Sequence, residues 1–584
     1  MGKIGADHNR ELAELVAAYL GRNLDRRGFL LRAAGLGLSL PGAAALLAAC
    51  GDDGGGGDTT AAGADTTPAT DAPSEAEPTA GGTLREGYHR DFSKHDPVTT
   101  NWYDPAFSAI YETILTNDPD GADVPQVATA FERSDDGLTY TFTIPEGRTF
   151  QSGEPLTAEA VAAFYTTMQG SFISTLASPV DTYEAPDPTT LVINMKNTWL
   201  GTLGPHKTGY WAIINVKAWE ESGGRDDPAN PFGTEYTDGL GPFTHTEWVP
   251  GSHVLVTRWE DYPGSVVPWF ENKGKAYLDA IRWVYIAEES QRATQLENGE
   301  LDTLLRPAFQ DTARLEGNAD MTVYRFPEWS GYILSMNRDY DEYFGDITVR
   351  QAMSHAIDRE GLVEAIFFGD AISTYGPFPG TDRNYEPGVE ALGAFDIDLA
   401  NQMLEDAGWT LGDDGVRAKE GVKLQFEFAI SNESLNVAIG TAVSGMLKEI
   451  GVDAQVTQYD LAVLFERQSA EARDAVPMSL FFWLWPIPLD VLTLFSSKDT
   501  VPVPNFSHAL TPAIDDAIAA WQQSATEEEA QAAASAFQLA WAEELPYIST
   551  VTQNAVFVKR NVVHGWLPTL WNLYPYYNDV WIEQ

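Results

Sequence analysis

The stretch DDGLTYTFTI, residues 135–144, indicates most clearly how the folded part of this chain is built. Asp-Asp-Gly is typical of a tight turn, and the residues after it alternate between apolar and polar side chains, which predicts a half-buried hairpin strand over 138–144. Thr157 then precedes a run with helical spacing, so we expect it to be a helix N-cap, with Ala160 where a glutamate would complete a capping box. A hairpin followed by a helix favours mixed α/β structure.

Similar patterns recur along the chain. Strands are predicted over 81–87, 423–430, 453–459 and 480–485, and helices over 108–115, 349–357 and 398–407. Gly299 and Gly408 follow helical runs and are expected to act as left-handed C-caps. The apolar positions of 349–357 fall on one helical stripe, which indicates core packing rather than a binding site. About five hundred residues follow position 80, enough for two or three packed bodies.

Several blocks of the chain, taken in order, resemble one known family. They are residues 81–84, 136–142, 153–159, 239–243, 248–251, 296–302, 349–359, 404–409 and 545–548. In these blocks the chain is similar to the extracytoplasmic solute-binding proteins of the peptide/nickel ABC importer family, solute-binding family 5, which includes oligopeptide- and dipeptide-binding proteins. Each block is weak alone, but their shared order over some five hundred residues is specific.

The resemblance implies an α/β, two-lobed fold like that of periplasmic binding proteins, of type II and of the large class with an extra subdomain. A hinge would join the lobes. Mapped onto this chain, lobe I covers 81–328 with an inserted subdomain at about 126–238, lobe II covers 329–548, and 549–584 returns to lobe I.

The same resemblance implies a receptor rather than an enzyme. Such a protein encloses a small-molecule or peptide ligand between its lobes and delivers it to an ABC permease, while a separate ATPase subunit uses the ATP. This agrees with the absence of a P-loop motif from the sequence. No cofactor is expected, and we expect a monomer.

The ligand is left open among an oligopeptide, another organic solute such as a sugar or opine-like compound, and a nickel chelate. Peptide-binding members of the family hold the free amine of the peptide with an aspartate three residues after a strand-terminal tryptophan. If Trp483 is that tryptophan, the aspartate position is occupied by Pro486. This departure puts classical peptide recognition in doubt, although Asp490 could supply the charge from a shifted loop.

Aromatic residues are the best indication of what the cleft binds, because flat rings stack on sugars, peptide planes or cations. Trp483 and Trp485 flank the end of a predicted buried strand. The other candidates fall near places where family members line the cleft; they are Trp102, Tyr103, Trp211, Trp329 and Tyr332. For these five, packing in the core is an equal alternative.

The N-terminal region predicts export and a lipid anchor. Arg26 and Arg27 precede an apolar run of small residues, a pattern typical of a twin-arginine signal, and the run ends at Cys50, the one cysteine of the chain. Residues 1–50 are therefore interpreted as a lipoprotein signal peptide whose cysteine receives the lipid. Residues 51–80 lack large apolar side chains and are interpreted as a disordered tether. We expect the protein on the outer face of the cytoplasmic membrane.

The composition excludes one class of partner. With 36 basic and 85 acidic residues the formal net charge is −49, so a nucleic acid would be repelled. The histidines show no spacing typical of a metal site, and none is predicted.

Two other functions stay open at this stage. An exported hydrolase could use paired carboxylates in an aromatic cleft, although no nucleophile motif marks one. A receptor that signals without transport would share the same fold and differ only in its partner.

Overall fold

The computed structural model describes residues 77–583 except 101–102, 172–178, 199–202, 329, 383, 485–504 and 570, and of Ser330, Trp483 and Leu484 it describes the backbone alone. All described residues belong to one compact unit, Pro68–Gln584. The expectations for residues 1–76, including Arg26, Arg27 and Cys50, lie outside them. Within the described ranges, none of the helices has the length and apolar character needed to cross a membrane.

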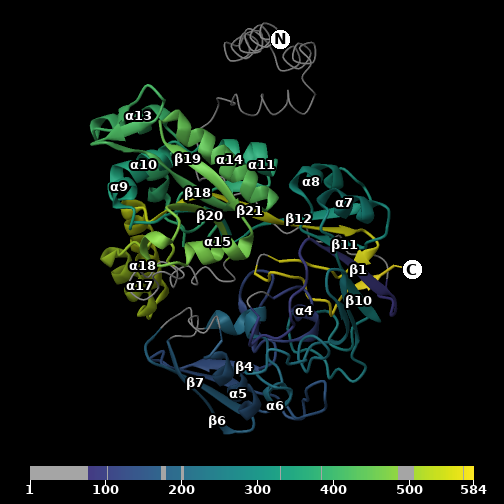
Figure 1. Ribbon diagram of the computed structural model, residues 1–584. Helices are drawn as coiled ribbons and strands as arrows, with labels where there is room; N and C mark the ends of the chain where they lie inside the picture. Colours follow the sequence, from purple (N-terminus) through teal and green to yellow (C-terminus); the bar gives the residue numbers. More distant parts are fainter. Residues whose placement is uncertain are drawn as a thin grey trace, which may run out of the picture. The chain divides into compact units, whose positions relative to one another are not determined.

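The largest element is a mixed sheet that runs through both halves of this unit (Figure 1). In the described residues it has twelve strands. Ten follow one another in space in the order β19 (Asp453–Tyr459), β18 (Gln425–Ser431), β20 (Met478–Leu484), β13 (Ser330–Met336), β21 (Tyr547–Arg560), β11 (Thr303–Leu305), β1 (Thr83–Tyr88), β10 (Ala280–Tyr285), β9 (His253–Arg258) and β8 (Phe243–Val249). Two more, β12 (Met321–Pro327) and β14 (Ala371–Ser373), pair with β21.

Strand β21 is shared between two hydrophobic cores. Its first half pairs with β13, where Tyr547 lies opposite Ser335, and its second half pairs with β12, where Arg560 lies opposite Met321. One core forms around β1 and β10, and a second forms around β13, β18 and β20. We call these halves lobe I and lobe II. The two-lobed α/β fold is thus the one that the sequence predicted, whereas the residue boundaries given for the lobes stay a prediction.

A separate four-stranded sheet belongs to lobe I. Its strands are, in spatial order, β4 (Ala130–Arg133), β5 (Thr139–Thr143), β7 (Thr190–Met195) and β6 (Val180–Asp187), and α5 (Ala158–Met168) packs on it. The predicted hairpin is confirmed, since β4 and β5 pair in antiparallel fashion and Gly137 has a φ of +69° in the turn. Thr157 caps α5 by accepting a hydrogen bond from the backbone of Ala160, at 3.3 Å.

Shorter elements complete lobe I. They are α4 (Phe107–Ile110), α6 (Val216–Glu221), α7 (Glu289–Glu297), α8 (Phe309–Glu316), the pair β2 (Leu115–Asn117) and β3 (Asp123–Pro125), the pair β22 (Val563–His564) and β23 (Trp581–Ile582), and the 3-10 turns η3 (Pro205–Lys207) and η4 (Gly209–Trp211). C-terminal aromatic residues, Trp566, Tyr574 and Tyr577 among them, pack into the core of lobe I.

Lobe II is largely helical around its strands. Its helices are α9 (Asp341–Phe344), α10 (Ile347–His355), α11 (Arg359–Phe367), α12 (Glu390–Gly393), α13 (Ile397–Asp406), α14 (Ser434–Glu449), α15 (Leu461–Gln468), α17 (Pro512–Gln522) and α18 (Glu527–Glu544), with the 3-10 turns η5 (Pro387–Val389) and η6 (Ala472–Asp474) and a small sheet of β15 (Thr410–Leu411), β16 (Arg417–Lys419) and β17 (Val422–Lys423). The stripe of α10 is buried, as its spacing predicted.

One predicted element is wrong in extent. The helix expected over 108–115 is only the single turn α4, because the chain becomes extended at Tyr111. From there the backbone carbonyl of Thr113 accepts a hydrogen bond from the backbone of Val127, and the Thr113 hydroxyl bonds Oε1 of Gln126 at 2.6 Å. These long-range bonds satisfy the backbone more fully than a short helix end would. Gly299 and Gly408, by contrast, have the left-handed backbone predicted for them.

Candidate functional site between the lobes

Each lobe has parallel strands whose carboxyl ends lie at one edge of the sheet. In lobe I, β1 is parallel to both β10 and β11, and these strands end at Tyr88, Tyr285 and Leu305. In lobe II, β18 is parallel to both β19 and β20. Ligands of open α/β sheets bind outside the carboxyl ends of such strands. The residues that follow these ends are therefore the first place to look for a binding site.

A chain of four polar side chains joins the two lobes at this level. The Arg306 guanidinium, directly after β11, forms an ion pair with Glu328, directly after β12. Gln553 on β21 donates from Nε2 to Oε2 of Glu328 at 3.1 Å, and the Tyr332 hydroxyl on β13 donates to Oε1 of Gln553 at 3.2 Å. The chain thus runs from a strand end in lobe I, across the shared strand, to lobe II.

Arg306 is the charged centre of this group. Its backbone has a φ of +55°, and its amide donates to the carbonyl of Val556 at 2.9 Å, which fixes the residue beside β21. Burial opposes its charge, but the Glu328 carboxylate together with Tyr574 and Tyr88 outweighs burial, so the pKa of Arg306 is raised above its ordinary value. One guanidinium nitrogen, Nη2, is buried and has no hydrogen-bond partner among the described residues.

A group of buried tyrosines of lobe I lies within electrostatic reach of the guanidinium. The hydroxyls of Tyr88 and Tyr574 lie 2.7 Å apart, and the ring of Tyr103 lies 5.5 Å from that of Tyr574 and 4.6 Å from that of Tyr210. Burial raises the pKa of Tyr103, and the positive charge of Arg306 acts in the opposite direction. Tyr103, a residue predicted from the sequence, therefore lies within electrostatic reach of Arg306.

Tyr332, also predicted from the sequence, approaches the same guanidinium from lobe II. Its ring packs against Phe482 at 4.9 Å and Phe367 at 5.7 Å. Burial raises its pKa, the carboxylates of Glu328 and Glu433 raise it further, and Arg306 opposes them. Tyr332 thus lies within electrostatic reach of a cation of lobe I and of Glu433, an acidic residue that follows β18 in lobe II.

The structure does not place the other predicted ligand residues at this site. Trp211 has no exposed surface and packs against Tyr165 and His206 in the core of lobe I, so its position is explained by packing and does not support a ligand contact. Trp483 lies in β20, where its backbone pairs with Gly331 of β13, and its side chain is not described. Trp102, Trp329, Trp485 and Asp490 lie outside the described residues. A ligand contact for any predicted residue stays a prediction.

Sequence reasoning missed Arg306, Glu328 and Gln553. No spacing could have found them, because the Glu328–Gln553 contact joins residues 225 positions apart. The usable signal was weaker: Arg306 directly follows a short strand that comes after one of the ordered blocks, and a charged residue at a strand end is a reasonable candidate.

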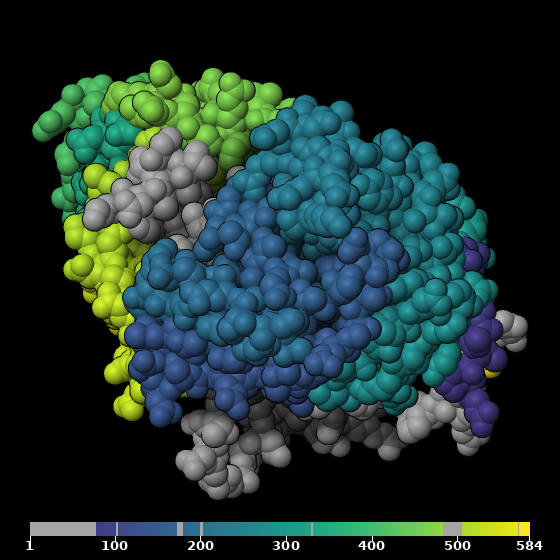
Figure 2. All heavy atoms as spheres, turned by 90° about the horizontal axis from the view of Figure 1, so that it is seen from below, coloured from purple at the N-terminus to yellow at the C-terminus, as the bar shows by residue number. Residues whose placement is uncertain are grey.

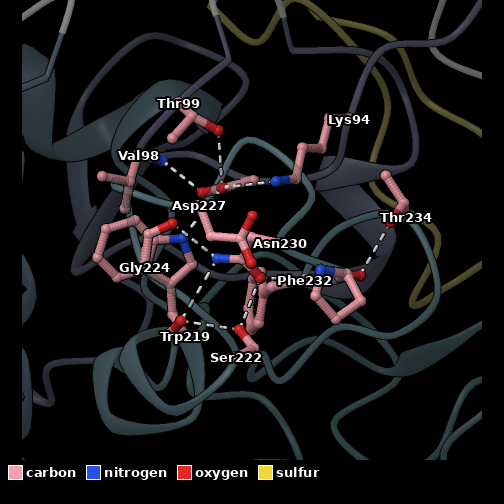
Figure 3. A network of polar contacts seen from close by, with 12 residues as sticks. Lys94, Val98, Thr99, Trp219, Ser222, Gly224, Asp227, Asn230, Phe232 and Thr234 are labelled. Carbon is pink, nitrogen blue, oxygen red and sulfur yellow. Dashed lines mark hydrogen bonds and ion pairs between the residues drawn. The ribbon is translucent and has the colours of Figure 1, made fainter.

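Lobe I contains a second buried polar network, whose groups are paired with one another and have a structural role (Figure 3). The buried Asp96 carboxylate accepts hydrogen bonds from the Val98 backbone at 3.0 Å, the Thr99 hydroxyl at 2.7 Å and Trp219 Nε1 at 3.0 Å, and lies 3.6 Å from Lys94 Nζ. Figure 3 labels these four partners. A carboxylate with these partners holds loops together and has no open position for a ligand. Elsewhere in the described ranges, no group of three or more His, Cys, Asp or Glu side chains is arranged to hold a metal ion.

Comparison with known proteins identifies the family of the chain. Residues 124–501 match the family model for the bacterial extracellular solute-binding proteins, family 5 Middle. Protein XP55 of Streptomyces lividans is 27% identical over 71% of this chain and 74% of its own length, and the glutathione-binding protein GsiB of Escherichia coli O1:K1 / APEC is 25% identical over 83% and 90%.

Among solved structures, the oligopeptide-binding protein AppA of Bacillus subtilis, in complex with a nonapeptide, superimposes with a TM-score of 0.73 at 21% identity, covering 87% of this chain and 100% of AppA. At that identity the likeness shows the fold alone. The family match covers more than half of the chain and carries the assignment. The chain therefore belongs to family 5 of the bacterial extracellular solute-binding proteins.

Proposed function

We propose that this protein is the substrate-binding component of an ABC importer, which captures an oligopeptide or a similar small organic solute between its lobes and delivers it to a membrane permease. The observation that carries the proposal is the continuous contact chain from Arg306 to Tyr332, which couples the lobes at the carboxyl ends of their parallel strands. The names of GsiB and AppA, which refer to glutathione and to oligopeptides, support a peptide-like ligand.

In this proposal closure is a population shift. A solute that contacts both lobes only in the closed form favours that form by the difference between its affinities for the two states. The permease then binds the closed form. Since β21 and the consecutive strands β12 and β13 connect the lobes, changes of their backbone angles would accommodate the motion.

A second set of contacts joins the lobes away from β21. Asn197, after β7, donates from Nδ2 to the carbonyl of Gln522 at 2.9 Å, and the Thr198 hydroxyl donates to the carbonyl of Gln523 at 3.0 Å. Figure 2 shows the blue surface of the four-stranded sheet of lobe I beside the yellow surface of α17 and α18. These bonds can form only when the two surfaces meet, so in the proposal they belong to the closed form.

The export route belongs to the proposal as well. Arg26 and Arg27 would direct the folded protein outward, and a lipid on Cys50 would hold it as a monomeric receptor on the outer face of the cytoplasmic membrane. Replacing Cys50 by Ala should abolish incorporation of labelled palmitate and release the protein from the membrane fraction. A membrane-bound, labelled Cys50→Ala variant would contradict the anchor.

The receptor function is tested by native mass spectrometry of residues 77–584, purified without denaturation, followed by identification of any released solute and a thermal-shift titration with it. The proposal expects an intact peptide or organic solute that raises the melting temperature in a saturable way. Recovery of hydrolysed products, or no saturable binding across peptides, sugars and nickel chelates, would contradict it.

A further inference from the structure

We propose that Arg306 and His89 form a subsite for a carboxylate group of the solute, at the carboxyl ends of β11 and β1. This inference rests on the proposed receptor function and adds the chemical class of the ligand to it. The solute would place its anionic end against lobe I.

Cations gather at this edge although the chain as a whole is strongly acidic. His89 directly follows β1, and burial together with the positive charges of Arg306, Arg292 and Arg90 holds its pKa well below the ordinary value. Burial lowers the pKa of Arg292, and the nearby carboxylates of Glu289 and Asp311 oppose that shift. Arg306 is paired with Glu328, and its positive charge extends to the rings around it.

The unpaired nitrogens distinguish Arg306 from the other arginines. Among buried arginine nitrogens without a partner in the described part of the chain, Arg306 contributes Nη2, whereas every other one is an Nε. Arg359 and Arg417, both fully buried, use their Nη groups on protein oxygens, as in the 2.8 Å bond from Arg359 Nη1 to the carbonyl of Gly393 and the 2.7 Å bond from Arg417 Nη1 to that of Trp409. Arg306 therefore has a terminal N–H donor group without a hydrogen-bond partner among the described residues.

His89 offers a second position of the same kind. Its Nδ1 is buried and has no hydrogen-bond partner in the described ranges. A neutral imidazole can carry its proton on Nδ1 and donate it. Strands β1 and β11 are parallel neighbours with Gly87 opposite Leu304, so His89 and Arg306, each two positions further on, follow adjacent strand ends. A carboxylate has two oxygens and could accept from a donor of each residue, and hydrogen bonds to a charged acceptor are the strong ones.

The surroundings favour an organic acid over a free inorganic anion. Tyr88, Tyr103 and Tyr574 are all buried, the ring of Tyr88 lies 4.7 Å from that of His89, and the ring of Tyr103 lies 5.5 Å from that of Tyr574, so aromatic rings gather at these strand ends. Rings pack against the carbon skeleton of a solute while the cation binds its charged group. A peptide with a free carboxyl terminus and a sugar acid both have this chemistry.

The test compares matched anionic and neutral solutes by calorimetry and native mass spectrometry. One arm uses alanine peptides of two to five residues with either a free carboxyl terminus or a C-terminal amide, and the other uses sugar acids beside their parent sugars. If the subsite exists, the acid should bind at least tenfold more tightly than its neutral counterpart in the set of solutes that the protein binds. The arm in which this happens identifies the source of the carboxylate.

Substitutions then locate the preference. Arg306→Gln should reduce the preference for the acid to less than about threefold, and Arg306→Lys should restore part of it. Arg314→Gln, on the surface of α8, is the matched control and should keep the full preference. Because Arg306→Gln leaves the Glu328 carboxylate without its cation, the double variant Arg306→Gln/Glu328→Gln is measured beside it, with ligand-free melting temperatures recorded for all variants.

Several outcomes would overturn the subsite. They are equal binding of acid and amide by the wild-type protein, a preference that survives Arg306→Gln, or tight binding limited to neutral solutes. The wild-type comparison decides the question even if no Arg306 variant folds. Saturable binding of neutral solutes would leave the receptor function standing while the subsite fails. A protein that binds no member of either set and co-purifies with no solute contradicts both.

Discussion

The hydroxyl of Tyr332 in lobe II donates a hydrogen bond to the side chain of Gln553, and Gln553 bonds in turn to Glu328, the ion-pair partner of Arg306. Gln553 lies on β21, the strand that both cores share, opposite Ala371 of β14. The Gln553 side chain thus connects the Tyr332 ring of lobe II with the charged residues at the ends of the lobe I strands.

Tyr332→Phe should loosen this connection without changing the ring packing. The variant removes the hydroxyl that donates to Oε1 of the buried Gln553. The loss of this hydrogen bond should lower the free energy of unfolding by about 1 kcal/mol. If the bond stabilises the closed form, the solute should also dissociate about fivefold faster. Denaturant titration and stopped-flow displacement measure the two effects. Tyr277→Phe, outside β21, is the control, and equal dissociation rates for the two variants would contradict the coupling.

Glu86→Gln should destabilise lobe I strongly. The buried Glu86 carboxylate accepts hydrogen bonds from Trp283 Nε1 at 2.7 Å, Trp566 Nε1 at 2.8 Å, the Tyr577 hydroxyl at 2.6 Å and the Thr303 hydroxyl at 2.8 Å. A glutamine places an NH₂ group against donors and leaves at least one buried pair unsatisfied, a cost of about 2 to 3 kcal/mol.

The measurement for Glu86 is the urea midpoint of the ligand-free protein. Glu260→Gln provides the control, because that carboxylate is exposed and pairs with Arg258 and Lys275 at the surface, where the loss should be much smaller. Similar midpoints for the two variants would show that the four donors find other partners.

The sequence predicted those parts of the fold that depend on local patterns. The turn at Gly137, the cap at Thr157 and the strand over 453–459 all follow from neighbouring residues, and the structure has each of them. The prediction of a helix over 108–115 was wrong because the backbone N–H of Thr113 donates to the side chain of Gln126, across the intervening segment, instead of continuing the helix. Local spacing contains no information about such a partner.

At the candidate site, too, some residues could be predicted from the sequence and others could not. Tyr103 and Tyr332 were selected because aromatic residues line clefts in the family, and both lie within electrostatic reach of Arg306. Arg306 itself is one of 36 basic residues, and its importance depends on where β11, β12 and β21 meet. Trp211 shows the converse, since a tryptophan attractive on chemical grounds is fully buried in the core.

Gly241→Ala should destabilise lobe I because two backbones meet there. The Gly241 amide donates to the carbonyl of Ile110 at 2.9 Å, and a Cβ atom at position 241 would lie 2.6 Å from the Ile110 carbonyl carbon. Since backbone atoms cannot move aside cheaply, we expect a loss of at least about 2 kcal/mol.

Gly445→Ala is the matched control for position 241. Gly445 lies inside α14, and a Cβ atom there has no neighbour within 4 Å, so the change should be neutral or stabilise by about 0.5 to 1 kcal/mol. Thermal unfolding of both variants gives the comparison. Equal melting temperatures would mean that the close approach at Gly241 is not a constraint.

His245 should make the protein less stable as the pH falls. Burial, with the neighbouring His95 imidazole, lowers the pKa of His245 from 6.5 to about 4, while the Thr234 backbone and Asp104 act in the opposite direction. The two imidazole rings are 5.7 Å apart. Between pH 6.5 and 4 the unfolded chain binds a proton that the native state does not, so native stability is present above pH 6.5 and is lost as the pH falls toward 4.

The loss has an upper bound of about 3 kcal/mol, which partial exposure of the ring reduces to about 1 to 2 kcal/mol. Glu86 contributes with the opposite sign, because burial raises its pKa and its protonated form favours the native state. For this reason the prediction concerns a difference between variants: His245→Gln should lose about 1 to 2 kcal/mol less than the wild type between pH 6.5 and 4 in urea titrations. His253→Gln on β9, whose ring lies 3.2 Å from Glu247 rather than beside a second histidine, is the control. If the wild type and His245→Gln lose stability in parallel, His245 is not the group that titrates.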